Sequence, residues 1–138
     1  MSCWLYKGKC LEVPPRGYYG FTYVITDDTG KKYYGKKAFS HRRKTKLSRK
    51  AQKIYGKRIK IEQVDSKWLN YWGSSKPLLE YIKSKGTKDF KREVIKLCKD
   101  KSSLTYWETS LLFEKKVMFE DSWNGHILSR FFKGRVKK

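Results

Sequence analysis

Two tyrosines, a histidine and a glutamate are the residues whose types and spacing could do chemistry in this chain. Tyr23 and Tyr33 lie ten residues apart, His41 follows within a run of cations, and Glu108 lies in a later segment. A phenol surrounded by cations can accept a proton, although an ordinary tyrosine with a pKa of about 10 is a poor base at neutral pH. Histidine can also move protons, and a carboxylate can bind a divalent cation.

Each of these residues also has a structural interpretation. Tyr23 and Tyr33 can simply be aromatic neighbours on adjacent strands. Glu108 completes the segment TYWE at 105–108, which has the pattern of a capping box at the start of a helix. The role of each residue therefore depends on the elements that position its side chain, which the surrounding sequence predicts.

The charge of the chain is strongly positive. Its 138 residues include 34 Lys+Arg against 13 Asp+Glu, which gives a formal net charge of +21. Hydrophobic residues make up 38% and aromatic residues 16%, enough for a folded core rather than a disordered basic tail. Because such an imbalance opposes folding through self-repulsion, it indicates a bound polyanion, with nucleic acid first and an anionic membrane surface second.

The cations are concentrated in one segment. No acidic residue lies between Asp28 and Glu62, and residues 31–60 hold 14 of the 34 cations. Between residues 40 and 60, apolar side chains recur at helical spacing, so the sequence predicts a basic amphipathic helix there. The apolar residues are Leu47, Ala51, Ile54, Tyr55 and Ile59. Cations without interleaved carboxylates would repel one another on such a helix, which favours contact with a polyanion.

A β-hairpin is predicted before this basic segment. Residues 20–26 are rich in β-branched and aromatic side chains, residues 27–30 have turn composition, and residues 31–36 can pair back. Residues 4–10 can add a short strand. Tyr23 and Tyr33 would thus sit on the two strands of one hairpin.

Later segments alternate between helix and strand. Ser75, after Ser74, can cap a helix that stops at Gly86, and residues 90–98 read as a strand. A further helix is expected from Ser102 or Ser103. This order predicts a small α/β fold with one domain over residues 1–138, a core of about 18–128 and a basic tail of 129–138.

Several functional classes are disfavoured. Cys3, Cys10 and Cys98 lack zinc-ligand spacing and are interpreted as free thiols. No segment has the length and apolarity of a membrane span, and the first residues lack the apolar stretch of a secretory signal, so a cytoplasmic location is expected. Nothing resembles a Walker loop, a zinc finger or a dinucleotide fingerprint.

The joint spacing of these motifs resembles the GIY-YIG nuclease superfamily. The segment GFTYVI at 20–25 is similar to the first family motif and YYGK at 33–36 to the second, with Phe-Thr-Tyr in place of Gly-Ile-Tyr. Glu108 precedes a pair of leucines as the family glutamate does, and Asn124 resembles a late family asparagine. The segment WLNYWGSS at 68–75 is similar to phage-encoded members.

The resemblance implies a fold, a reaction and a site. The fold would be an antiparallel three-stranded sheet begun by a hairpin and flanked by helices, and the reaction metal-dependent hydrolysis of phosphodiester bonds. Tyr33 would be the general base, with its phenol acidified by neighbouring cations, and Tyr23 would orient water or phosphate. Arg43, or the adjacent Arg42, would hold a phosphate oxygen, and Glu108 would bind one Mg2+ or Mn2+. His41 stays a second candidate for the base.

The implied partner is double-stranded DNA. Cations and one amide are the expected DNA-binding residues: Lys36, Lys37, Arg42, Lys46, Arg49, Lys50 and Asn124. A phage-encoded homing-like or restriction-like enzyme acting in an infected bacterial cell fits this set. Because one site cuts one strand at a time, clean double-strand breaks would need a dimer or two successive events. The alternatives are a non-catalytic basic nucleic-acid-binding protein and an RNA-binding, ribosome-associated protein.

Overall fold

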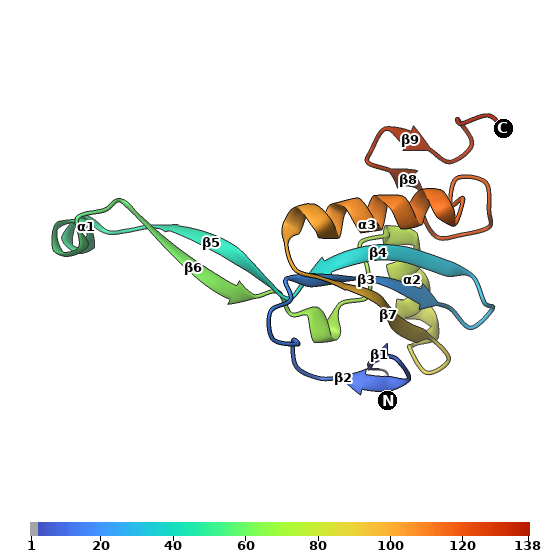
Figure 1. Cartoon of the computed structure of the whole chain (residues 1–138), viewed down its shortest axis with the longest axis horizontal. Helices are drawn as coiled ribbons and strands as arrows, with labels where there is room; N and C mark the ends of the chain where they lie inside the picture. The colour runs from blue at the N-terminus through green and yellow to red at the C-terminus, as the bar shows by residue number, and fades with distance from the viewer. Residues whose placement is uncertain (1–2) are drawn as a thin grey trace.

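The computed structural model describes residues 3–138, which form a body and a long projecting arm (Figure 1). The arm consists of β5 (Ser40–Lys46), α1 (Arg49–Tyr55) and β6 (Ile59–Asp65). The body holds all the other elements. They are β1 (Trp4–Tyr6), β2 (Lys9–Leu11), β3 (Gly20–Thr26), β4 (Lys32–Ala38), the 3-10 helix η1 (Trp68–Asn70), α2 (Lys76–Lys85), β7 (Lys91–Cys98), α3 (Lys101–Glu114), β8 (His126–Ile127) and β9 (Phe131–Phe132).

The main sheet has the strand order β2-β1-β7-β3-β4. β4, β3 and β7 pair antiparallel, so the hairpin and the third strand lie as the sequence predicts. β1 then joins β7 in parallel and β2 joins β1, which makes the sheet mixed and five-stranded rather than three-stranded. The extra strands are held because Trp4 of β1 is fully buried in the core.

The hairpin turn is fixed by one carboxylate. Asp27 Oδ1 accepts hydrogen bonds from the backbone N–H groups of Thr29 at 2.8 Å and Lys31 at 2.9 Å. Gly30 supplies the positive φ of 92° that closes the turn. The resulting register places Tyr23 opposite Gly35.

An aromatic core covers one face of the sheet. Phe21, Tyr23 and Ile25 of β3 point into it and are at most 1% exposed. The ring of Trp4 packs at 5.0 Å from the rings of Phe21 and Tyr23, and its indole N–H donates to the carbonyl of Trp68 at 2.7 Å. η1 and α2 close this side, which holds Tyr23 in place.

The helices of the body begin and end at recognisable caps. Ser75 caps α2 by accepting from the N–H of Leu78, and Gly86 ends it, as predicted. α3 begins one to two residues earlier than expected, because Asp100 caps it by accepting from the N–H of Ser103 at 2.7 Å. α3 contacts β3, β4 and β7 and buries Leu104, which holds the helix against the sheet.

The predicted helix over residues 40–60 is wrong. β5 and β6 pair antiparallel from Ser40↔Asp65 to Lys46↔Ile59, and only Arg49–Tyr55 at the tip of the arm is helical within residues 40–65. Repulsion between neighbouring cations weakens a long helix here, and Gly56, with a φ of 67°, ends the short one. The alternation of Ile59 and Ile61 with polar residues suits a strand.

The cysteines are not all free thiols. Cys3 and Cys10 form a disulfide with a Cα–Cα distance of 5.7 Å, which corrects the sequence interpretation, and Cys98 is free and buried. The pairing depends on the β1–β2 hairpin, which the sequence indicated only weakly. None of the helices described within residues 3–138 has the length and apolarity to cross a membrane.

Gly35→Ala is expected to destabilise the fold. A Cβ at this position would lie 2.5 Å from the Tyr23 hydroxyl and 2.7 Å from its ring. Because Tyr23 is 1% exposed and enclosed by aromatic rings, it cannot move aside, and overpacking costs about 1–3 kcal/mol. Urea denaturation of both proteins measures the loss in free energy of unfolding.

Gly125→Ala is the matched control for this change. A Cβ at Gly125 meets nothing within 4 Å, so the substitution should alter the free energy of unfolding by less than about 0.5 kcal/mol. Equal stability of the Gly35→Ala variant and the parent would contradict the close packing of Tyr23 on β4.

Candidate active site

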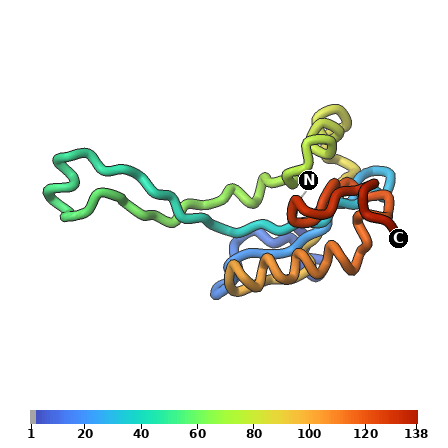
Figure 2. Tube along the Cα trace, turned by 90° about the horizontal axis from the view of Figure 1, so that it is seen from above, coloured from blue at the N-terminus to red at the C-terminus, as the bar shows by residue number. Residues whose placement is uncertain are grey.

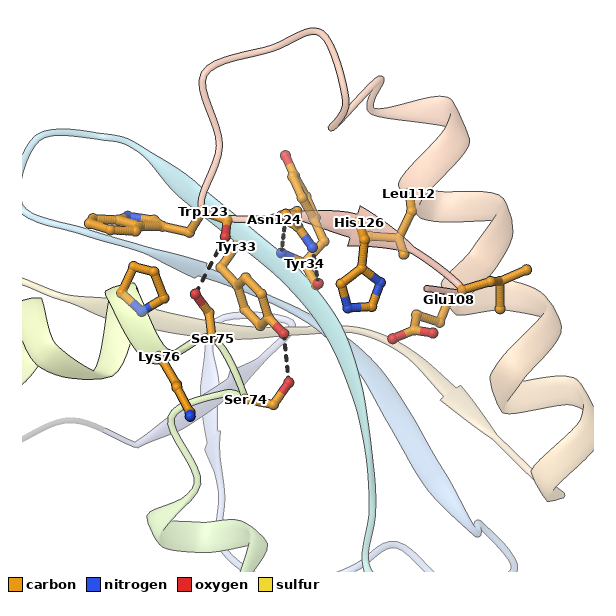
Figure 3. Close-up of a pocket in the computed structure, with 13 residues that line it drawn as sticks. Tyr33, Tyr34, Ser74, Ser75, Lys76, Glu108, Leu112, Trp123, Asn124 and His126 are labelled. Atoms are coloured by element: carbon orange, nitrogen blue, oxygen red, sulfur yellow. Dashed lines mark hydrogen bonds between the residues drawn. The ribbon is translucent and has the colours of Figure 1, made fainter. Parts of the chain in front are cut away.

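A pocket of about 410 Å³ lies along the outer edge of β4 (Figure 3). Its walls come from the start of α2, the middle of α3 and the segment 123–128. Side chains that can transfer protons or bind anions and cations gather there. They are Tyr33, Ser74, Lys76, Glu108, Asn124 and His126.

Tyr33 enters this pocket from β4 with its hydroxyl 3.0 Å from Ser74 Oγ, where either oxygen can donate. Its ring packs beside Tyr23 and against Gly73, where a Cβ would lie 2.9 Å from the ring. Burial raises the pKa of Tyr33, against a smaller opposing effect of the hydrogen bond with Ser74. The expectation that cations acidify this phenol is therefore wrong, because burial raises its pKa and the neighbouring Tyr71 and Glu108 raise it further.

Glu108 points into the pocket from α3, toward His126 (Figure 3). It is not a capping residue, because Asp100 caps α3 and Thr105 already lies inside the helix. Burial raises the pKa of Glu108, opposed by the positive charges of Lys36 and His126. A carboxylate thus stands in the pocket with less counter-charge than would offset its desolvation.

Two lysines of β4 lie near this region with different contacts. Lys36 Nζ donates to Thr105 Oγ1 at 2.9 Å, which places its charge near Glu108. Lys37 lies on the other face of the strand, where its Nζ sits 4.2 Å from the ring centre of Tyr71 and burial lowers its pKa. Of the two lysines, Lys36 is therefore the one whose charge acts on Glu108.

Asn124 uses both polar atoms of its side chain on the backbone of Tyr34. Its Nδ2 donates to the Tyr34 carbonyl at 2.8 Å and its Oδ1 accepts from the Tyr34 N–H at 3.0 Å. The side chain is 5% exposed. The structure thus gives Asn124 a positioning role, in which it holds the segment carrying His126 against β4.

Tyr23 lies beneath the pocket rather than in it. It is 1% exposed, and burial together with the neighbouring Tyr33 and Tyr71 raises its pKa well above the usual value. In this arrangement its hydroxyl does not face the space where water or phosphate would enter. Its contact with Tyr33 supports the tyrosine that does.

The remaining predicted site residues lie on the arm. Arg43 and His41 are exposed on β5, and Arg43 pairs with Glu62 at 3.5 Å. Arg42 and Lys46 lie on the same strand, while Arg49 and Lys50 begin α1. The structure does not bring any of these six residues to the pocket.

Three pocket residues escaped the sequence reasoning. Ser75 caps α2, as the sequence predicts, whereas Ser74 contacts Tyr33, which the sequence does not indicate. Lys76 follows them in the pocket wall. His126 gave no periodic or spacing signal, because its position depends on the Asn124 contact two residues earlier.

The pocket offers one carboxylate, Glu108, to a divalent cation. Within residues 3–138, no three His, Cys, Asp or Glu side chains gather at one point, so Glu108 is a single carboxylate rather than part of a cage. Mg2+ commonly binds one or two carboxylates, substrate phosphates and several waters. A cation beside Glu108 would also offset the desolvation that raises its pKa.

Glu108→Gln should change stability in a pH-dependent way. Because the folded-state pKa is raised above the ordinary value of 4.5, the unfolded chain releases this proton first. The parent therefore loses stability as pH rises from 4.5 through the folded pKa, and the variant lacks this loss. Melting temperatures should favour the variant more at pH 7 than at pH 4.

Glu114→Gln provides the control on the same helix, since Glu114 is exposed and outside the pocket. Its melting temperature relative to the parent should show no comparable gain between pH 4 and pH 7. If the Glu108→Gln variant instead loses stability relative to the parent on raising the pH, the burial described for this carboxylate is incorrect.

A comparison with protein-family models identifies the family of the chain. Residues 4–133 match the family described as "Putative endonuclease segE, GIY-YIG domain". No curated protein and no solved structure matches the chain. Since the family match extends from β1 to β9, the chain belongs to the segE-type GIY-YIG endonuclease family, whose members hydrolyse phosphodiester bonds in DNA.

Proposed function

We propose that this protein cleaves double-stranded DNA with a divalent metal ion at the pocket beside β4. One observation carries the proposal: Tyr33 and Glu108, far apart in the sequence, line the same pocket together with Lys76 and His126. The net charge of +21 supplies the attraction for a polyanion.

Glu108 would hold the metal ion, which when bound supplies positive charge at the leaving oxygen and the scissile phosphate. The protein would hold this carboxylate in a fixed position and in a partly dehydrated environment. α3 provides the rigid backbone, and Lys36, anchored on Thr105, fixes a positive charge nearby. Such a carboxylate is ionised more completely once a cation is present.

Tyr33 and Ser74 would form a proton relay. Because the raised pKa keeps Tyr33 protonated at neutral pH, its phenolic oxygen can take a proton from the attacking water only while its own proton moves to Ser74 Oγ. Ser74 is exposed and can release its own hydroxyl proton to solvent as it receives one. No net proton then accumulates on either side chain.

Lysines rather than Arg43 would neutralise the phosphate in the pocket. Lys76 lies in the pocket wall and Lys36 stands beside Glu108, whereas Arg43 is on the arm. Lysine acts on phosphate as a compact point charge. Arg42, Lys46, Arg49 and Lys50, which lie on the arm, would then contact DNA away from the cleaved bond.

The biological setting proposed is that of a phage-encoded enzyme with a homing-like or restriction-like role inside an infected bacterial cell. The segE-type family match supports it. With one pocket per chain, each binding event cuts one strand, so a double-strand break would need a second copy or a second event.

Glu108→Gln is expected to abolish metal-dependent cleavage while keeping DNA affinity. The amide retains the shape of the side chain but loses the charge that binds the cation. Nicking of supercoiled plasmid with Mg2+ or Mn2+, with and without chelator, measures cleavage, and fluorescence anisotropy with chelator measures affinity. Glu114→Gln should cut at the parent rate. Cleavage by the Glu108→Gln variant at the parent rate would rule out Glu108 as the metal ligand.

Tyr33→Phe should slow cleavage by about 10²–10⁴-fold, because it removes only the hydroxyl that relays the proton. Folding and DNA affinity should persist, since the ring packing on Tyr23 and Gly73 is kept. Tyr106→Phe is the control, as Tyr106 is 64% exposed on α3 and outside the pocket. Near-normal plasmid nicking by the Tyr33→Phe variant would reject the relay and direct attention to His126.

A further inference from the structure

The arm is a two-stranded ribbon whose two faces differ in charge. It extends far from the body in Figures 1 and 2. Because directly paired residues of antiparallel strands share a face and alternate along each strand, the β5–β6 register assigns every side chain to one face. Residues 40–65 contain ten cations and only two acidic residues, Glu62 and Asp65.

One face, which we call the closed face, pairs both of its cations with one carboxylate. It carries Arg43 paired opposite Glu62, and Lys60 two residues before Glu62 on β6. Arg43 and Lys60 lie 3.5 Å and 3.6 Å from the same Glu62 carboxylate oxygen. His41 and Val64 complete this face near the root of the arm.

The other face, which we call the open face, keeps its cations without a carboxylate along most of its length. Lys44 is paired opposite Ile61, Lys46 opposite Ile59, and Arg42 opposite Gln63. Asp65 shares this face only at the root of the arm, opposite Ser40. The open face therefore concentrates the unbalanced charge of the ribbon.

Exposed apolar side chains lie among these cations. Ile59 is 46% exposed and Ile61 is 50% exposed, and no core covers them. A face that combines cations, an amide and exposed isoleucines is complementary to a DNA groove, which offers phosphates, hydrogen-bonding base edges and thymine methyls. A two-stranded ribbon also fits the width of the major groove.

The root of the arm is fixed to the body. Only Phe39 separates β4 from β5, and it is 5% exposed. Its N–H donates to the Tyr19 carbonyl at 3.0 Å, and its carbonyl accepts from the Ser66 N–H at 3.1 Å. The strand that carries Tyr33 thus continues into the arm through a buried, hydrogen-bonded joint.

We propose that the open face of the arm binds along duplex DNA, with the arm held in a fixed orientation to the body by its root at Phe39. The closed face points away from the DNA. This inference rests on the proposed function only in taking DNA as the substrate. It goes further in naming which arm cations bind DNA and which do not.

The test compares two double variants that remove the same charge from opposite faces. Arg42→Gln with Lys44→Gln acts on the open face, and Arg43→Gln with Lys60→Gln acts on the closed face. Affinity for a labelled DNA duplex is measured by fluorescence anisotropy over a series of salt concentrations, with chelator present so that no cleavage occurs. All four residues are exposed, so both variants should melt like the parent.

The open-face variant should lose at least about tenfold in affinity near 0.1 M salt, and its log–log salt slope should flatten by about 1.8. The closed-face variant should lose clearly less of both. Equal losses in the two variants, no loss in either, or a larger loss in the closed-face variant would each overturn the proposal. Stronger competition by duplex RNA or anionic vesicles than by duplex DNA would overturn it as well.

Failure of this inference is distinguishable from failure of the proposed function. The affinity measurements exclude cleavage, and they use no variant of the pocket. If the parent protein nicks plasmid but the two arm variants bind DNA equally well, the pocket assignment stands and the arm assignment is rejected. The reverse pattern keeps the arm and rejects the pocket chemistry.

Discussion

The contact between the Tyr23 ring and the bare backbone of Gly35 is the constraint on which the rest of the structure depends. It fixes the register of β3 against β4, since a side chain at position 35 would collide with the buried phenol. That register sets Tyr33 beside Tyr23 and sends the following residues of β4 into the root of the arm. The pocket and the arm are thus oriented by one packing contact between β3 and β4.

Burial around this contact also determines the electrostatics of the pocket. The pKa values of Tyr23, Tyr33 and Glu108 are all raised, and desolvation is the largest cause in each case. A protein with a net charge of +21 would be expected to stabilise anionic side chains, but its cations lie largely on the arm and the outer surface. Local dehydration therefore outweighs the net charge at the distances that matter for proton transfer.

Local signals in the sequence predicted the parts of the fold that local interactions decide. The turn at Asp27, the cap at Ser75 and the stop at Gly86 each depend on neighbours within a few residues. The arm could not be derived this way, because apolar side chains at helical spacing also fit two strands that pair across α1. Of the candidate site, Tyr33 and Glu108 were indicated by the resemblance to the family motifs. Ser74 and His126 reach the pocket through long-range contacts that leave no local pattern.

The contacts of the segment 122–124 with β4 have a consequence for solubility. β4 is an edge strand, and such a strand offers unpaired N–H and carbonyl groups to any other chain. Here the Trp123 N–H donates to the Lys32 carbonyl at 2.8 Å, and the Asn124 amide occupies both backbone groups of Tyr34. A single amide side chain thereby stands in for a neighbouring strand. The segment 122–124 therefore protects this edge from pairing with the edge strand of another molecule, while the pocket beside it stays open to a substrate.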